Sequence, residues 1–419
     1  MNATVKHKPS CADAFESGVL PLPEALDRIL DATRPVTSFE CLAIRAALGR
    51  VLYADIVALT HVPPHTNSAM DGYALNSEQF PEQGTREFCV IGIAYAGRPF
   101  TRQPDKGECI RIMTGAAIPP GTDSVVMQEQ VEPLGNRIKI GKGHRRGQNV
   151  RLAGEDITAG NTLLNQGTRL RAAELGLLAS QGIAEVCVYR RPRVAFFSTG
   201  NELCSLGETR GDNAIYDSNR YTLFGMLSEL GMELIDMGVV KDQRDTITDA
   251  LQCAASNADL VITTGGVSVG EADYVKDVLQ LIGKVVFWKV AMKPGRPLAF
   301  GQLADALVFG LPGNPVAVMV TFEQLVKPAL RRLTGETDRV PLRLQARCLM
   351  TIRKRPGRTE FVRGILERDS LGHWAVCSTG AQGSGILSSM SRANCLIVLP
   401  ESSGTVGTGE YVEVEPFPP

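Results

Sequence analysis

The chain of 419 residues has few of the features that mark nucleic-acid-binding or membrane proteins. Its charges nearly cancel, with 44 Lys and Arg against 45 Asp and Glu, so the overall balance favours neither nucleic acid nor an anionic membrane as a partner. No apolar stretch approaches the length that crosses a bilayer, and the first residues have no apolar core of signal-peptide length. We therefore expect a cytoplasmic protein that binds small or locally charged ligands.

Metal-binding cysteine patterns are also missing. Ten cysteines are present, but no two are spaced as CxxC and none lies in a Cys/His cluster of zinc spacing. We interpret them as reduced, mostly buried thiols. Histidine occurs only five times, and no histidine lies in the loops singled out below.

The length allows roughly two to four domains, and the local composition and hydrophobic pattern change along the chain. An amphipathic helix is predicted over 22–33, followed over 40–160 by short β-type runs separated by Gly, Pro and Asn, which indicate an inserted β module. From 193 to 333 apolar strands alternate with amphipathic helices, a pattern typical of a parallel sheet covered on both faces. Beyond 340 the chain returns to β-type runs. We expect strands at 193–199, 233–240, 259–264, 284–290 and 306–311, and helices at 169–183, 218–230, 244–256, 272–282 and 314–333.

In a parallel α/β sheet, ligands bind beyond the carboxyl ends of the strands. The residues that follow the predicted strands are rich in glycine, acids and bases. This composition is typical of a site for a phosphorylated ligand and a divalent cation, in which acids hold the metal and bases hold the anion. The acids are Glu202, Asp242 and Asp273, and the bases are Lys289, Lys293 and Arg296.

The segment "TTGGVSVGEADY" (263–274) resembles a phosphate-binding loop but ends in two carboxylates. It is not a P-loop, because Glu271 and Ala272 occupy the positions of the lysine and the hydroxyl residue, and Val267 breaks the dinucleotide-binding pattern. What remains is a turn whose N–H groups can face an anion. Asp273 is then a helix N-cap, a Mg²⁺ ligand or both.

Simpler roles are open for the other residues of this set. Asp242 could cap the helix that follows it, Lys289 and Lys293 could be solvated, and "GLPGNP" (310–315) could be only a turn before a helix.

Ten short motifs stand along the chain in a fixed order: "HTNSAMDGYAL", "IRIMTGA", "GEDI", "STGNEL", "IYDSN", "TTGGVSVGEADY", "KPGRPLAFG", "GLPGNPVA", "PGRTEFVRG" and "QGSGILSSM". In this order they resemble the molybdopterin molybdenumtransferase family, the MoeA-type enzymes related to the E domain of gephyrin. The resemblance covers nearly the whole chain from about residue 20. One motif alone would be weak evidence, but ten in order are very specific.

The resemblance implies an enzyme that inserts molybdate into adenylylated molybdopterin and releases AMP with the help of Mg²⁺, without a nucleophilic side chain. It also implies an elongated homodimer whose clefts are shared between subunits. The expected fold is a central doubly wound, largely parallel α/β domain with an inserted β module and a C-terminal β domain. The expected domains are a connecting domain (39–57 and 160–191), the inserted β-rich domain (58–159), the α/β molybdopterin-binding domain (19–38 and 192–340) and the C-terminal β domain (341–419).

The resemblance also implies roles for particular residues. Glu202, Asp242 and Asp273 surround the metal and nucleotide, and Lys289 and Lys293 lie near the phosphates and the oxyanion. One departure from the family is Thr66, where an acid is usual. The remaining implied positions are Asp71 and Thr114 from the other subunit, Arg363 and Ser384 on the molybdate side, Pro312 and Pro315 in the neighbouring loop, and Arg296, Gly265, Gly266 and Ser268 around the substrate.

Two alternative functions fit parts of the pattern. A molybdopterin adenylyltransferase shares the glycine loop and the sheet, although it needs neither the inserted module nor the C-terminal domain. A non-catalytic dimeric scaffold would use the same fold to bind a partner peptide, but the intact charged set argues against it. Nucleic-acid binding through the basic stretch at 139–151 is not expected, because that stretch lacks interleaved aromatic residues. Other molybdenum cofactor proteins, including an adenylyltransferase, are possible partners, and the pattern does not distinguish molybdate from tungstate.

Overall fold

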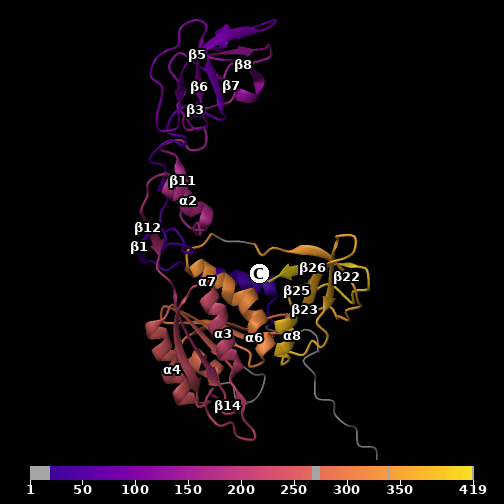
Figure 1. The fold of residues 1–419 in the computed structure, drawn as a ribbon. Helices are drawn as coiled ribbons and strands as arrows, with labels where there is room; N and C mark the ends of the chain where they lie inside the picture. The colour runs from indigo at the N-terminus through magenta and orange to yellow at the C-terminus, as the bar shows by residue number, and fades with distance from the viewer. Residues whose placement is uncertain (1–18, 267–273, 338–339, 418–419) are drawn as a thin grey trace, which may run out of the picture. The chain divides into compact units, whose positions relative to one another are not determined.

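A computed structural model describes residues 19–266, 274–337 and 340–417 of the chain. The chain divides into two compact units, a smaller one of residues 41–188 and a larger one that contains the rest (Figure 1).

The larger unit contains a six-stranded sheet with the order β16-β13-β17-β21-β20-β18. The first four strands are parallel, and β20 is antiparallel to both of its neighbours, β21 and β18. Strand β18 therefore runs in the same direction as the parallel strands. The strands are β13 (Arg193–Thr199), β16 (Glu233–Val240), β17 (Leu260–Thr264), β18 (Lys284–Lys289), β20 (Pro297–Leu303) and β21 (Ala306–Leu311).

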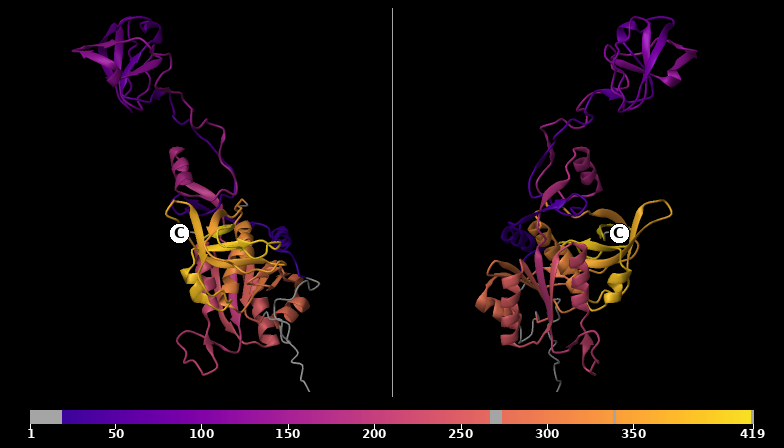
Figure 2. Two further views of the ribbon diagram at one scale, coloured as in Figure 1. Left: turned by 90° about the vertical axis from the view of Figure 1, so that its right-hand side faces the viewer. Right: turned by 60° about the vertical axis from the view of Figure 1, so that its left-hand side comes forward.

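Helices cover both faces of this sheet (Figures 1 and 2). Successive residues of a strand point to opposite faces, and in β13 Phe196 lies in a core cluster with residues of α3 and α6, whereas Phe197 lies in a second cluster with residues of α4 and α5. The sheet is therefore buried on both sides, as its continuous apolar strands require. The helices are α1 (Leu22–Ala32), α3 (Ser218–Glu229), α4 (Arg244–Asn257), α5 (Tyr274–Ile282) and α6 (Pro315–Thr321), which continues through a π-helical turn (Phe322–Val326) into α7 (Lys327–Leu333).

A second sheet of the larger unit is built mainly from the C-terminal residues, in the order β19-β23-β24-β22-β26-β25. An additional pairing of β23 with β25 closes it into a barrel. The short β19, from the segment between β18 and β20, pairs with β23. The elements are β19 (Met292–Lys293), β22 (Leu344–Cys348), β23 (Thr359–Arg368), β24 (Trp374–Ser378), α8 (Leu387–Arg392), β25 (Cys395–Leu399) and β26 (Tyr411–Pro416), and β14 (Leu203–Cys204) pairs with β15 (Ile215–Tyr216) elsewhere in the unit.

The smaller unit is mostly β-structure. Its main sheet has the order β7-β4-β6-β5-β9-β8, and the pairs β1–β12, β2–β11 and β3–β10 form two-stranded sheets. The elements are β1 (Phe39–Ala43), β2 (Ile56–Val57), β3 (Asn67–Ser68), β4 (Gly72–Leu75), β5 (Arg86–Ala94), β6 (Glu108–Ile112), β7 (Ser124–Met127), β8 (Val131–Leu134), β9 (Arg137–Ile140), β10 (Val150–Arg151), β11 (Thr162–Leu164), α2 (Ala172–Ser180), β12 (Glu185–Tyr189) and the 3₁₀ turns Ser77–Gln79 and Gln128–Gln130.

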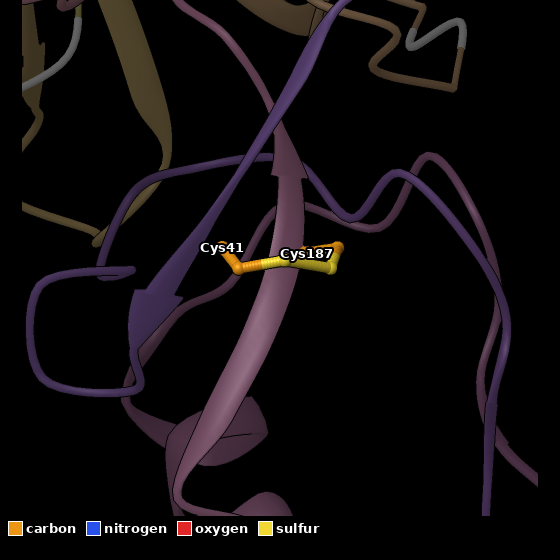
Figure 3. Close-up of a disulfide and its surroundings, with 2 residues drawn as sticks. All are labelled: Cys41 and Cys187. Atoms are coloured by element: carbon orange, nitrogen blue, oxygen red, sulfur yellow. A yellow bond between two sulfur atoms is a disulfide. The ribbon is translucent and has the colours of Figure 1, made fainter.

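The predicted fold class is confirmed, and β20 is the strand of the α/β sheet that was not predicted. The interpretation of every cysteine as a reduced thiol is wrong, because Cys41 of β1 and Cys187 of β12 form a disulfide (Figure 3). The two are 146 residues apart in sequence, so only the pairing of β1 with β12 brings them together. The cysteines therefore give no support for a reducing compartment, and cytoplasmic localisation stays a prediction. Within the described part of the chain, no helix is both long and apolar enough to span a membrane.

Candidate functional site

The predicted site residues of the α/β domain lie along one edge of its sheet. Strands β13, β16, β17, β21 and β18 all run in one direction, so their carboxyl ends share that edge. The antiparallel β20 begins there. The strand order therefore places acids after β16 and β13, glycine-rich turns after β17 and β21, and bases between β18 and β20. Adjacent strands are about 4.8 Å apart, so roughly 14 Å separates β13 from β20. Any ligand that meets both charges would have to extend along the edge.

Asp242 and Glu202 form the acidic end of this edge. Burial raises the pKa of the Asp242 carboxyl, and the nearby Glu202 carboxylate raises it further. Asp242 Oδ1 is buried and has no hydrogen-bond partner among the residues that the structure describes. Helix α4 begins after Gln243 and has no side-chain cap, so Asp242 does not cap it. A buried carboxylate oxygen without a donor, next to a second acid, fits a divalent cation.

The glycine turn after β17 packs directly on β13. Gly265 and Gly266 have φ values of +84° and +63°. A Cβ atom at Gly265 would lie 2.1 Å from the carbonyl oxygen of Thr199, and one at Gly266 would lie 2.6 Å from the Thr199 hydroxyl. Only glycine satisfies both the backbone conformation and this contact. Ser268 and Asp273, which follow in the same loop, lie outside the described residues.

The bases lie on the segment that joins β18 to β20. Lys289 ends β18, and Arg296 immediately precedes β20. Lys293 Nζ lies 3.0 Å from Glu360 Oε2 in β23, although the Lys293 side chain is 52% exposed. The Lys293 ammonium is therefore held at the surface by a buried acid rather than freely solvated.

A hydrogen-bond network fixes the loop after β21. Asn219 of α3 donates through Nδ2 to the Thr264 hydroxyl (3.0 Å) and to the Gly313 carbonyl (2.8 Å). The Thr264 hydroxyl donates to the Pro312 carbonyl (3.0 Å). Pro315 begins α6, where its missing N–H is not needed. The "GLPGNP" segment is thus tied to the glycine-turn strand and is more than a turn before a helix.

Arg363 of β23 belongs to the C-terminal barrel and is 1% exposed. Its guanidinium donates to the Ser389 hydroxyl and to the carbonyls of Ala381 and Gly383, and burial lowers its pKa. The Ser384 carbonyl in the same loop accepts from the Val316 amide of α6 (3.0 Å). This contact joins the loop next to Arg363 to the first turn after Pro315.

Asp71 and Thr114 lie together in the smaller unit. Asp71 Oδ1 accepts from the backbone N–H and from the hydroxyl of Thr114, both at 2.7 Å. These bonds lower the pKa of the Asp71 carboxyl, the backbone bond most strongly. At the position where the family usually has an acid, the Thr66 hydroxyl accepts from the Ala153 amide (3.3 Å).

Sequence reasoning singled out the charged residues of the site but missed two neutral residues, Asn219, which fixes the loop after β21, and Ser389, which contacts Arg363. Asn219 lies in "IYDSN" and Ser389 in "QGSGILSSM", so both were within recognised motifs. The signal that could have found them is a polar residue on an otherwise apolar helix face.

Comparison with known proteins gives one family throughout. Residues 20–182 match the MoeA N-terminal region (domain I and II), residues 195–332 a probable molybdopterin binding domain, and residues 345–417 the MoeA C-terminal region (domain IV). A molybdopterin molybdenumtransferase of Haemophilus influenzae is 43% identical over 95% of this chain and 99% of its own length. Gephyrin of Dictyostelium discoideum is 35% identical over 96% of this chain and 64% of its own.

A solved structure agrees with the sequence comparison. The crystal structure of the molybdopterin biosynthesis moeA protein from Pyrococcus horikoshii matches with a TM-score of 0.82 and 32% identity, and covers 95% of this chain and 100% of that one. The chain therefore belongs to the molybdopterin molybdenumtransferase (MoeA) family.

Proposed function

We propose that the protein inserts molybdate into adenylylated molybdopterin and releases AMP in a Mg²⁺-dependent reaction. As a member of its family it is a transferase of molybdenum cofactor biosynthesis with a molybdopterin-related substrate. The observation that carries the finer proposal is the order of charges along the sheet edge, from the acids Asp242 and Glu202 through the glycine turns to the bases of the β18–β20 segment. An elongated substrate with phosphates at its centre fits this order.

The acids at β16 and β13 are proposed to hold the metal. Mg²⁺ is usually bound by one or two carboxylates together with substrate phosphates and water, so Asp242 and Glu202 are sufficient, with Asp273 as a third candidate. The buried Oδ1 of Asp242 supports this role because it has no protein donor among the described residues. When bound, Mg²⁺ would offset the negative charge of the phosphates.

The bases and the glycine turn are proposed to hold the phosphates. Lys289, Lys293 and Arg296 would face the phosphoanhydride, and the N–H groups of the turn would add neutral donors. When the bond to AMP breaks, negative charge develops on the leaving phosphate oxygen, and cations already in position stabilise it without reorganisation. The turn residues in this role are Gly265, Gly266 and Ser268.

The loop next to Arg363 is proposed to receive molybdate. Molybdate is a tetrahedral dianion, for which a guanidinium and hydroxyl or backbone donors are suitable partners. Arg363 and Ser384 would contact it, and Pro312 and Pro315 would shape the adjoining wall. Asp71 and Thr114 are proposed to enter the cleft from the second subunit of a homodimer.

The reaction is tested by incubating the pure protein with adenylylated molybdopterin, molybdate and Mg²⁺ while AMP and active cofactor are measured together. We expect both products in equal amounts, and neither when EDTA removes the metal. Net formation of adenylylated molybdopterin from molybdopterin and Mg-ATP would instead identify an adenylyltransferase. A dimer without either activity would indicate a scaffold.

A further inference from the structure

Arg363 is a buried cation whose partners are all uncharged. It is 1% exposed, and among the described residues its guanidinium contacts one hydroxyl and two carbonyl oxygens but no carboxylate. A buried guanidinium is costly unless an anion balances it. The positive charge is therefore left available for an anionic ligand.

Ser389 of α8 sets the orientation of this guanidinium. Arg363 Nε donates to Ser389 Oγ at 3.0 Å, and the Ser389 hydroxyl itself donates to the Ile386 carbonyl at 2.6 Å. Because the hydroxyl proton is committed to Ile386, only a lone pair of Oγ faces Nε. The serine is fully buried, so water does not replace it as the acceptor.

The second contact that orients the guanidinium is with the loop between β24 and α8. Arg363 Nη2 donates to the Gly383 carbonyl at 2.9 Å. Two contacts, at Nε and at Nη2, define the plane of a guanidinium, and both acceptors are neutral. The arrangement holds the group in one orientation without cancelling its charge.

We propose that Ser389 is a positioning residue for the oxyanion site at Arg363, and that it fixes the guanidinium for molybdate without touching the substrate. This inference rests on the proposed function, in which Arg363 receives molybdate. Removing the hydroxyl leaves Nε buried without an acceptor and lets the guanidinium turn toward other carbonyls. Losing the alignment of one charged hydrogen bond is expected to lower the affinity for the anion about tenfold.

The neighbouring Ser388 provides a matched control. It lies on the same short helix but is exposed, and Ser389 is buried. Ser389→Ala and Ser388→Ala therefore make the same chemical change one residue apart. Arg363→Ala serves as the reference for complete loss of the cation.

The experiment measures the KM for molybdate and the kcat for AMP release at saturating molybdate, together with equilibrium dialysis of the full-length protein against molybdate alone. For Ser389→Ala we expect a KM and a Kd for molybdate about tenfold higher, with the KM for adenylylated molybdopterin unchanged. Ser388→Ala should match the unmodified protein. If Ser389→Ala does not fold, Ser389→Cys fills the site with a slightly larger side chain of the same shape and a weaker acceptor, and should show an increase in the same direction.

The outcomes separate this inference from the proposed function. If Arg363→Ala leaves molybdate binding intact, Arg363 is not the molybdate residue and the proposed function is wrong at that point. If Arg363→Ala weakens molybdate while Ser389→Ala behaves as Ser388→Ala does, only the positioning role is refuted. An equal rise in the KM of both substrates would show that Ser389 supports the fold in general, which also overturns the inference.

Discussion

Replacing Asp242 with asparagine is expected to stabilise the protein and at the same time to remove its response to Mg²⁺. The amide keeps the size of the side chain but removes a charge that is partly buried, lacks a donor for Oδ1 and is repelled by Glu202. Leaving a polar group buried and unpaired costs about 1–3 kcal/mol, and more when the group is charged, so the neutral amide is penalised less than the carboxylate. Because Asp242 is only partly buried, we expect a gain of about 1 kcal/mol, or about 2–4 °C in Tm for a domain of this size.

The sign of the pH dependence follows from the raised pKa of Asp242. A carboxyl whose pKa is higher in the folded than in the unfolded protein destabilises the fold when it is ionised. That penalty is complete above the folded pKa and disappears as the pH falls below the unfolded value. The difference in Tm between Asp242→Asn and the unmodified protein should therefore be largest near neutral pH and shrink under acidic conditions.

The assay is thermal unfolding at neutral and acidic pH, with and without Mg²⁺. Mg²⁺ should raise the Tm of the unmodified protein, since a ligand stabilises the state that binds it, but not that of the variant. Asp245→Asn is the control, because Asp245 lies in the exposed first turn of α4 and its charge favours the helix, so its loss should lower stability slightly. A lower Tm for Asp242→Asn at neutral pH without Mg²⁺ would refute the reasoning and make Asp242 a structural acceptor.

Three further predictions concern the smaller unit and the dimer. Reduction of the Cys41–Cys187 disulfide, which closes a separation of 146 residues, should destabilise the smaller unit by about 5 kcal/mol on the loop-entropy relation, and calorimetry with and without reductant measures the loss. Hydrogen bonds from the Arg171 guanidinium and backbone amide hold the pKa of Glu174 at about 2, below the ordinary 4.5. The stability that ionised Glu174 adds should therefore be lost as the pH falls from 4.5 towards 2. Glu174→Gln should abolish this part of the pH dependence of thermal unfolding. Asp71→Ala and Asp273→Asn subunits should each be inactive alone but should recover about a quarter of the unmodified rate when they are mixed. About half of the dimers are then mixed, and each mixed dimer has one intact cleft of its two. A mixture that exchanges subunits yet stays inactive would exclude the shared cleft.

The sequence was sufficient for the parallel strands of the α/β sheet, because they are apolar on both faces and the helices between them are amphipathic. It was not sufficient for β20, since "PLAFGQL" (297–303) directly follows a Gly-Pro-rich segment and is not separated from β18 by a helix, so the alternation that predicts parallel strands is broken there. The disulfide was missed for a different reason. Cys41 and Cys187 are paired by a sheet contact between segments that no local pattern connects.

The candidate site likewise has one part that the sequence predicts and one part that it does not. Charged residues after strands are visible in a sequence, because the strand ends of a parallel sheet meet at one edge. The neutral residues that fix the loops of the site and Arg363 are visible only in three dimensions: Asn219 reaches Thr264 and Gly313 from a helix, and Ser389 reaches Arg363 from another. The boundaries of the four domains, the Mg²⁺ ligands and the dimer stay predictions.

The single antiparallel strand of the α/β sheet explains how a set of bases comes to share one edge with the acids. In a fully parallel sheet, each loop at the carboxyl edge leads into a helix and contributes one short turn. Here β20 turns back at that edge, so the whole segment from Lys289 to Arg296 stays there, and β19 anchors its middle to β23. The acids lie at the opposite end of the strand order, with the glycine turns of β17 and β21 between the two groups. A ligand that meets both charges has to lie across the glycine turns, where backbone N–H groups and the missing side chains allow an anionic group the closest approach.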